Sequence, residues 1–323
     1  MIVYHDLNDI DIKERTAIAL GNFDGVHRGH QELIRRAVAA GREKNLASAV
    51  FTFSNHPRNL LAGEDVVKNI LYPEEKQRII EDLGVDILFD IPFTWDICAM
   101  EPLSYIEELL FGAFRAQEIF CGFNYTFGYK AGGDVRLLKK EGAARGREVH
   151  VLDPVRVNGR IVSSTLIREC IEVGNIEACD AFLGRPYSLN GTVVHGNEIG
   201  RTIGFPTCNL LVDETMVTPP NGVYVTNCLV EELADLQEAE QTGYPFVWRR
   251  YPAVTNIGVK PTIGTYAKNV ETHIFDFDRD MYGQDIRVEF LKMTRPETRF
   301  DGLEALQAQI ARDCANARAY HGI

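Results

Sequence analysis

Residues 16–40 read TAIALGNFDGVHRGHQELIRRAVAA, and this stretch decides the fold of the first half of the chain. Residues 16–23 are a short apolar run that ends in a glycine and an asparagine, which is typical of a buried strand. Leu33, Ile34, Ala37 and Val38 then recur at helical spacing, which predicts a helix over 29–40 with Gly41 as its stop. The order is therefore strand, glycine-rich loop, helix.

The same alternation continues through the first half of the sequence. Strand-like runs cover 47–53, 85–91, 118–122 and 148–155, and helix-like runs cover 73–83, 103–114, 134–145, 164–173 and 176–183. Strands separated by helices of this length indicate a parallel sheet with helices on both faces. The ligand site of such an α/β sheet lies at the carboxyl ends of its strands.

The pattern of predicted elements changes after Gly184. Strand-like segments at 187–195, 222–230, 251–257, 270–277 and 286–293 are separated by Gly, Pro and Asn, and one clear helix follows at 303–319. This order predicts an antiparallel β-barrel with a terminal helix. We therefore expect two domains, 1–184 and 185–323, with the acidic stretch 231–250 as a surface loop or hairpin insertion.

The composition narrows the class of protein. The chain of 323 residues is 45% hydrophobic and 25% charged, with a net charge of −12, which disfavours wrapping nucleic acid but allows small phosphorylated ligands. Its beginning lacks the order of a signal peptide, and no apolar run could span a bilayer, so we expect a cytoplasmic protein without a membrane partner. Seven scattered cysteines without a CxxC pair argue against disulfides and against a thiolate zinc site.

The loop GNFDGVHRGH at 21–30 is the first candidate site. It opens a helix, where free amides and the helix dipole favour anions, and Gly21 and Gly25 let the backbone approach a ligand. His27 and His30 are three residues apart and so share one side of the helix, where both imidazoles can donate to nucleotide phosphates. The alternative is that one histidine caps the turn and the other is merely exposed.

This loop is similar to the HxGH-type signature of nucleotidyltransferases, in the form found in bacterial bifunctional riboflavin kinase/FAD synthetases. Further matches follow in family order: TFSNHPR at 52–58, GFNYTFGYKAGGD at 122–134 and SSTLIR at 163–168. The chain departs from the usual pattern at Asn55, where the family has Pro, and at Asn124-Tyr125, where it often has Asp-Phe. The resemblance implies a Rossmann-like nucleotidyltransferase domain.

The resemblance also implies roles for single residues. Catalysis of adenylyl transfer falls to His27, His30 and Arg168, and Asn124 contacts flavin. Ser164 and Thr165 begin a helix, where an ordinary cap is the alternative to nucleotide binding. The nucleotide and its phosphates are expected to contact Gly21, Asn22, Gly25, Ser164 and Thr165; Asp24 is left unassigned.

The second candidate site lies in NGTVVHGNEIGRTIGFPTCNL at 190–210. Gly196 and Gly200 lie where a strand turns and returns, and Arg201 could bind phosphate. Pro206 keeps the chain extended, so Thr207 and Asn209 point the same way and can coordinate Mg²⁺. The alternative is a turn with local hydrogen bonds.

This stretch resembles the riboflavin kinase signature, whose core normally reads PTAN and here reads PTCN at 206–209. The resemblance makes Glu271 the catalytic base, which the chemistry requires because riboflavin offers a neutral alcohol as nucleophile. NIGVKPTIG at 256–264 and TRPETRF at 294–300 also match, which implies Lys260 near phosphate and Arg295 near flavin.

The sequence thus predicts an enzyme that phosphorylates riboflavin to FMN and then joins FMN to AMP from ATP, giving FAD and pyrophosphate. Its expected partners are the small molecules riboflavin, FMN and ATP, with Mg²⁺ as cofactor. Two alternatives stay open: an enzyme with one live module, and a flavin-binding or regulatory protein without turnover. The sequence assigns no oligomeric state and does not reveal whether FMN passes directly between modules.

Overall fold

The computed structural model describes residues 1–196, 199–262 and 265–323. It divides the chain into two compact units, Met1–Ser164 and Thr165–Ile323. The helix α7 (Ser164–Glu172) begins at this division, so α8 (Ile176–Leu183) belongs to the second unit. The sequence had assigned both helices to the first domain, and the boundary at 184 stays a prediction.

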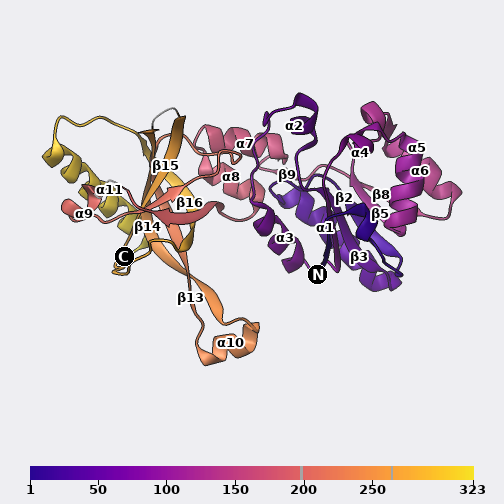
Figure 1. The fold of residues 1–323 in the computed structure, drawn as a ribbon, viewed down its shortest axis with the longest axis horizontal. Helices are drawn as coiled ribbons and strands as arrows, with labels where there is room; N and C mark the ends of the chain where they lie inside the picture. The colour runs from indigo at the N-terminus through magenta and orange to yellow at the C-terminus, as the bar shows by residue number, and fades with distance from the viewer. Residues whose placement is uncertain (197–198, 263–264) are drawn as a thin grey trace. The chain divides into compact units, whose positions relative to one another are not determined.

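The first unit is built on a parallel sheet of six strands, in the order β1-β4-β3-β2-β5-β8 (Figure 1). The strands are β1 (Ile2–Tyr4), β2 (Thr16–Leu20), β3 (Ala47–Phe53), β4 (Ile87–Ile91), β5 (Ala116–Gly122) and β8 (Glu148–Leu152). Short pairs are formed by β6 (Thr126–Phe127) with β7 (Gly133–Asp134) and by β9 (Arg156–Val157) with β10 (Arg160–Ile161).

Helices cover both faces of this sheet, as the sequence predicted (Figure 1). Along β2, Ala17 and Ala19 pack on the face of α1 and α3, whereas Ile18 and Leu20 pack on the face of η2 and α6. The helices are α1 (Arg28–Lys44), α2 (Pro57–Ala62), α3 (Pro73–Asp82), α4 (Trp95–Ala99), α5 (Pro102–Ser104), the π-helix η2 (Tyr105–Ala113), α6 (Val135–Ala144), and the 3-10 turns η1 (Leu7–Asp9) and η3 (Tyr129–Ala131).

The prediction that Gly41 stops the first helix is wrong. The helix α1 continues to Lys44 and ends at Asn45, which adopts the left-handed conformation with φ 53°. Gly41 is instead buried inside the helix, where a Cβ would lie 3.0 Å from the carbonyl oxygen of Leu46. Glycine is required at this point because the returning chain approaches the helix backbone closely, not because the helix ends.

The second unit contains a closed antiparallel barrel in the order β11-β12-β15-β14-β13-β16. Its strands are β11 (Tyr187–Val194), β12 (Cys208–Leu211), β13 (Gly222–Leu233), β14 (Phe246–Thr262), β15 (Thr265–Ile274) and β16 (Asp285–Pro296). Inside the barrel the hydroxyls of Thr226, Thr255 and Thr272 bond in series at 2.8 and 2.9 Å, which satisfies polar groups that burial removes from water. The terminal helix α11 (Leu303–His321) completes the predicted architecture.

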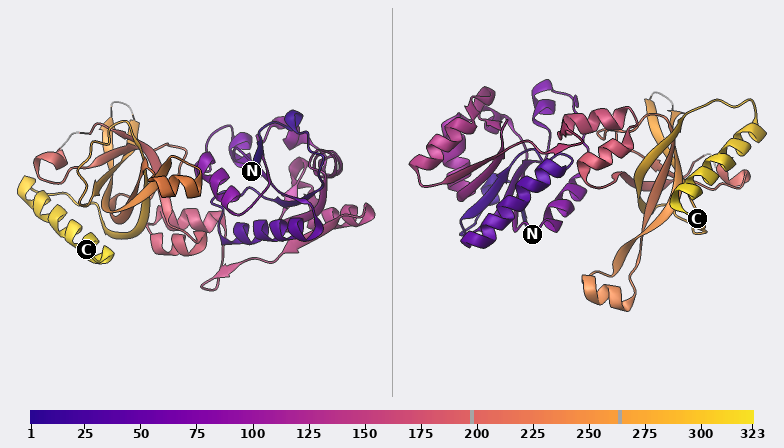
Figure 2. Two further views of the ribbon diagram at one scale, coloured as in Figure 1. Left: turned by 90° about the horizontal axis from the view of Figure 1, so that it is seen from below. Right: turned by 180° about the vertical axis from the view of Figure 1, so that it is seen from behind.

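The acidic stretch 231–250 is a hairpin insertion, one of the two forms that the sequence allowed. The strands β13 and β14 continue beyond the barrel as a two-stranded ribbon with α10 (Leu236–Thr242) at its tip (Figures 1 and 2). The sequence missed α10 and the short helix α9 (Ile199–Thr202). Asp235 and Glu238 form a capping box that begins α10, a pattern present in the sequence but hidden by the surrounding acidic residues.

None of the seven cysteines forms a disulfide, in agreement with their scattered positions. Five are buried and two are partly buried. Burial raises the pKa of Cys121 to about 12 and that of Cys314 to about 11, so both stay neutral thiols at physiological pH. No helix in the described part of the chain combines the length and the apolar character needed to cross a membrane.

Candidate active sites

The loop that leaves β2 has an unusual backbone. Three of its residues have positive φ: Phe23 at 46°, Gly25 at 82° and Val26 at 35°. A β-branched residue rarely adopts such a conformation, and the side chains of Phe23 and Val26 are fully buried, so packing holds the loop in place. The sequence predicted a tight turn at Gly25, and the structure extends the strain to its neighbours.

The two histidines meet at the start of α1. Their rings stack with centroids 3.6 Å apart, as their spacing predicted. His27 is also the N-cap of α1, where its Nδ1 accepts a hydrogen bond from the backbone N–H of His30 at 3.2 Å. An accepting Nδ1 is unprotonated, so neutral His27 carries its proton on Nε2 and can donate from there. One histidine thus caps the helix, as the alternative interpretation held.

Asp24, which the sequence left unassigned, connects three segments. Its Oδ1 accepts from the backbone N–H of Ile70 at 3.0 Å, and its carbonyl oxygen accepts from Oγ of Ser164 at 2.8 Å. Because this bond uses the hydroxyl proton of Ser164, that hydroxyl has no second proton to give a phosphate. Anion binding at this point would depend on backbone N–H groups at the start of α7.

The other predicted residues of the first site are more exposed. Asn22 and Asn124 follow the carboxyl ends of β2 and β5, which are neighbours in the sheet. Both are exposed, and both lie at the edge where the sequence placed the ligand. On α7, Thr165 is exposed and Arg168 is partly buried in the second unit.

A small cleft of about 40 Å³ opens beside this loop within the first unit. Its walls are Asn22, Asp24, Phe53, Ser54, Asn55, His56, Asn69, Leu71, Pro73 and Lys76. Asn55, which departs from the family pattern, is held rigidly: its Oδ1 accepts from the backbone N–H of Phe93 at 2.6 Å and its Nδ2 donates to the carbonyl of Phe93 at 3.1 Å. The wall therefore remains fixed without the usual proline.

In the barrel, Asn209 and Glu271 are direct cross-strand partners between β12 and β15. A third residue, Asn269, bridges them: its Nδ2 donates to Oε1 of Glu271 at 2.7 Å and to Oδ1 of Asn209 at 3.3 Å. The sequence analysis missed Asn269. The signal was available, because Asn269 and Glu271 are two residues apart on one strand and share a face.

Glycines allow the close approach of backbone to these groups. A Cβ on Gly196 would lie 2.5 Å from Nδ2 of Asn209, and one on Gly200 would lie 2.3 Å from the carbonyl oxygen of Phe205 and 3.6 Å from Oγ1 of Thr207. Both glycines therefore pack against predicted metal ligands. The side chains of Arg201 and Lys260 lie outside the part that the structure describes, so their phosphate contacts stay predictions.

Neighbours of Glu271 on β15 show how the strand is divided between two faces. Cys208, which precedes Asn209 on β12, pairs with Thr272 and points to the face opposite to Asn209, and burial raises the pKa of its thiol to about 11. His273 shares the face of Glu271, and its Nδ1 lies 2.7 Å from the carbonyl oxygen of Pro206. Burial lowers the pKa of His273, and because a carbonyl oxygen can only accept, Nδ1 of the neutral ring carries the proton and donates to it.

Arg295 makes structural contacts. Its Nε and Nη2 donate to the carboxylate of Asp313 on α11 at 2.7 to 3.1 Å, and Nη1 donates to the carbonyl of Pro296. This bidentate pair joins β16 to the terminal helix. The flavin contact proposed for Arg295 is untested.

Comparisons with known proteins agree with the two units. A family model described as FAD synthetase matches residues 9–166, and one described as riboflavin kinase matches residues 183–321. The bifunctional riboflavin kinase/FMN adenylyltransferase of Escherichia coli K12 is 34% identical over 311 residues, covering 96% of this chain and 94% of that protein. The protein of the same name from Bacillus subtilis is 33% identical over 318 residues, with the same coverage.

A solved structure has the same architecture. The crystal structure of a macrolide-efflux protein from Streptococcus pneumoniae is 32% identical, covers 98% of both chains and superposes with a TM-score of 0.85. Two family models in series, with relatives that match them over nearly their whole length, lead to one assignment: the chain belongs to the bifunctional riboflavin kinase/FMN adenylyltransferase family.

Proposed function

We propose that this chain makes FAD in two steps: the barrel unit phosphorylates riboflavin to FMN, and the parallel-sheet unit transfers AMP from ATP to FMN. The observation that carries the proposal is the presence of both family domains in one chain, each with the polar groups that its reaction needs. Its substrates are small molecules, and we propose neither a nucleic-acid nor a membrane partner. A cytoplasmic location remains a prediction.

In the kinase step, a riboflavin hydroxyl oxygen attacks the γ-phosphorus of ATP, and the bond to the β-phosphate oxygen breaks. The attacking hydroxyl must lose its proton, and we assign its acceptance to the carboxylate of Glu271. Asn269 donates to Oε1 of Glu271, which orients the carboxylate. Arg201 and Lys260 are proposed phosphate contacts, and Arg295 is a proposed flavin contact.

The residues beside Glu271 fit a magnesium ion. Oδ1 of Asn209 accepts one hydrogen bond and so retains a lone pair, and we propose Oγ1 of Thr207 as a second oxygen ligand. When bound, Mg²⁺ would neutralise charge on the ATP phosphates. Gly196 and Gly200 keep both oxygen ligands accessible to the nucleotide because they add no side chain in front of them.

In the second step, a phosphate oxygen of FMN attacks the α-phosphorus of ATP, and pyrophosphate leaves. The attacking phosphate is already anionic, so no general base is required, and the barrier is repulsion between anions. We assign charge stabilisation to His27, His30 and Arg168, the first two through imidazole N–H groups. Gly21, Asn22, Gly25, Ser164 and Thr165 position the nucleotide, and Asn124 contacts flavin.

One experiment tests the whole proposal. The purified chain is incubated with riboflavin, ATP and Mg²⁺, and FMN and FAD are resolved by chromatography over time. We expect FMN to appear first and FAD to follow. FMN alone, or FAD only from added FMN, would mean that one module is inactive; bound flavin without any product would mean a flavin-binding protein and would refute the enzymatic assignment.

A further inference from the structure

The cleft beside the histidine loop contains a buried lysine to which the two-step reaction assigns no role. Lys76 lies in the first turns of α3 and is only 7% exposed, yet it lines the cleft. Its Nζ donates to Oδ1 of Asp90 at 2.8 Å and to the carbonyl oxygen of Phe53 at 3.1 Å. Asp90, on β4, is 1% exposed and is not among the residues that line the cleft.

The lysine keeps one donor available. An ammonium carries three N–H groups, and Asp90 and Phe53 are its two acceptors within the described part of the chain. Burying an ion pair is expensive and gives little net stability, so a site of this kind calls for another explanation. The pair forms a fixed dipole whose positive end borders the cleft.

The rest of the cleft offers donors as well. The amides of Asn22 and Asn69 and the hydroxyl of Ser54 make no side-chain hydrogen bond within the described residues. His56 accepts from the backbone N–H of Arg58 through Nδ1 at 3.2 Å, so neutral His56 carries its proton on Nε2. The one carboxylate in the wall, Asp24, is held by the backbone N–H of Ile70. Donors beside an oriented ammonium suit a phosphate ester.

The position of the cleft favours one of the two substrates. Asp24 lies between two sides of the loop. Its carboxylate accepts from the backbone N–H of Ile70, next to the cleft. Its carbonyl oxygen accepts from the hydroxyl of Ser164, where we place the nucleotide. Phe53, Leu71 and Pro73 add apolar side chains to the wall of the cleft. ATP and FMN need separate places around the histidines, so the cleft is left to FMN.

We propose that Lys76 binds the phosphate of FMN in this cleft, with Asp90 and the carbonyl of Phe53 orienting its ammonium. The inference rests on the proposed adenylyl transfer and adds a binding residue for its flavin substrate. It also gives a reason for discrimination against riboflavin in this step, because riboflavin has no phosphate for the ammonium to bind.

The test replaces the ion pair without leaving a buried charge. Lys76→Met/Asp90→Asn keeps the volume and removes both charges, whereas Asp90→Asn alone keeps the ammonium. We expect the double variant to raise the KM for FMN about tenfold, the loss of one charge-assisted hydrogen bond, with the KM for ATP within about twofold. Asp90→Asn alone should not raise the KM for FMN.

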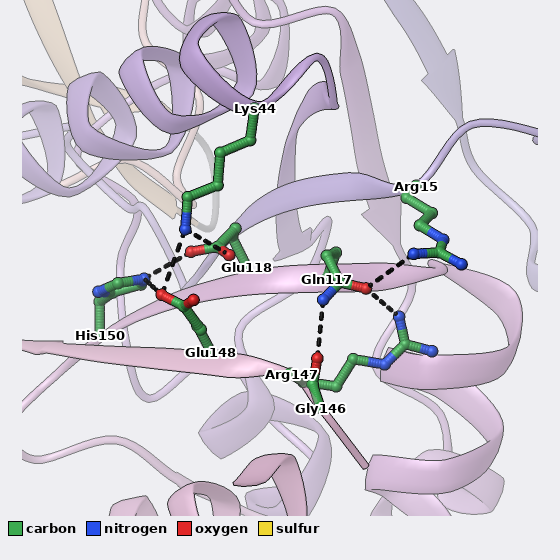
Figure 3. A network of polar contacts seen from close by, with 8 residues as sticks. All are labelled: Arg15, Lys44, Gln117, Glu118, Gly146, Arg147, Glu148 and His150. Carbon is green, nitrogen blue, oxygen red and sulfur yellow. Dashed lines mark hydrogen bonds and ion pairs between the residues drawn. The ribbon is translucent and has the colours of Figure 1, made fainter.

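A matched control exists at the other end of the same sheet (Figure 3). Lys44 donates to Oε1 of buried Glu118 at 2.8 Å and to Glu148 at 3.2 Å, and His150 lies 2.7 Å from the other oxygen of Glu118. Lys44 is the last residue of α1, at the opposite end of that helix from the histidines, and Glu148 begins β8. Lys44→Met/Glu118→Gln should leave both KM values unchanged, whatever it does to stability.

The outcomes separate cleanly once thermal melting shows that each variant is folded. An unchanged KM for FMN in the folded double variant overturns the inference, and so does a rise confined to ATP, which would assign the lysine to the nucleotide. Fluorescence titration with FMN compares the same variants without turnover. A wild type that binds FMN through Lys76 but forms no FAD would refute the proposed function and leave this inference standing.

Discussion

His27 and His30 form a single stacked unit at the start of α1, so their contributions should be inseparable from the loop that holds them. We expect His30→Ala to lower the rate of FAD formation at least about a hundredfold, because it removes a donor to the developing charge. FMN should still accumulate from riboflavin, since Glu271 is untouched. Chromatography of both products over time checks this.

The control is His150→Ala, which removes a histidine in the middle of β8, in the same parallel-sheet unit. This variant should make FAD at nearly the wild-type rate. Loss of both steps in folded His30→Ala would argue against two separate sites.

Glu271 is the residue on which the kinase step depends. Glu271→Gln preserves shape but cannot accept the riboflavin proton, so we expect the rate of FMN formation to fall about a hundredfold or more. FAD should still form from added FMN. Glu231→Gln, at an exposed position on β13, serves as the control. Equal kinase rates in wild type and Glu271→Gln would exclude the carboxylate as the base.

Some contacts of single residues could be predicted from the sequence, and others could not. The paired histidines could be anticipated from their local spacing, whereas the family motifs singled out Asn209 and Glu271 without predicting that they pair across two strands. The bond from Asp24 to Ile70 joins residues 46 positions apart, and no local pattern encodes it. The prediction that Gly41 ends the helix was wrong for a related reason: the residue that packs closely against it is Leu46, which lies beyond the end of the helix.

At the scale of elements, the strained loop after β2 should depend on glycine for two reasons. Gly25 has φ 82°, and a Cβ there would lie 3.2 Å from Ile70. Gly63, after α2, has φ 73° with nothing within 4 Å. Alanine at either site costs about 1 kcal/mol of backbone strain, but only Gly25→Ala must also displace a neighbour.

We therefore expect Gly25→Ala to lower the rate of FAD formation roughly tenfold, because a displacement of the loop moves the histidines out of position. Gly63→Ala should lower the melting temperature without this loss of rate. Steady-state assays and thermal melts of both variants provide the comparison. Equal losses of activity would mean that strain alone matters and that the contact with Ile70 does not.

The helix α8 has a carboxyl group with an unusual pKa. Burial is the largest cause that raises the pKa of Asp180, from 3.8 to about 8, although the backbone N–H of Tyr187 donates to it at 2.8 Å and opposes the shift. An acid whose pKa is raised by folding contributes stability that is complete below about pH 4. That contribution is lost as the pH rises through about 8.

Asp180→Asn keeps an acceptor for Tyr187 and removes the titration. We expect the variant to match the wild type at pH 4 and to exceed it by several kcal/mol in unfolding free energy of the second unit at pH 8.5. Denaturant unfolding at both pH values measures this. The exposed Glu214→Gln should show no such dependence, and a constant difference between Asp180→Asn and the wild type would contradict the assignment.

For the whole molecule, the order and the lengths of the strand-like and helix-like runs were enough to predict a parallel sheet followed by a barrel. Helix-length segments between buried strands are long enough for the crossover connections that parallel strands need. Strands separated only by short Gly and Pro turns can pair antiparallel. The place where the first unit ends was harder to predict. The helices α7 and α8 read as a continuation of the alternation, and only tertiary contacts decide which core they complete.

Those contacts make the boundary testable. On α8, Ile176, Cys179, Phe182 and Leu183 are at most 2% exposed, and the helix packs against β11 and β16. Asp180 accepts from Tyr187, and Glu177 pairs with Lys292 at 3.3 Å. A fragment of residues 185–323 would expose the barrel surface that these side chains cover, whereas a fragment of residues 165–323 would retain it.

We expect the fragment of residues 165–323 to be more stable than that of 185–323 by several kcal/mol, because each large apolar side chain that stays buried contributes about 1.5–3 kcal/mol. The melting temperatures should differ by at least about 10 °C, and only the longer fragment should convert riboflavin to FMN at the full-length rate. The complementary fragments, 1–164 and 1–184, provide the opposing comparison. If residues 165–184 stabilise the barrel fragment but not the parallel-sheet fragment, helices α7 and α8 belong to the kinase core. If they stabilise only the parallel-sheet fragment, the boundary lies at 184 and the two helices complete the adenylyltransferase domain.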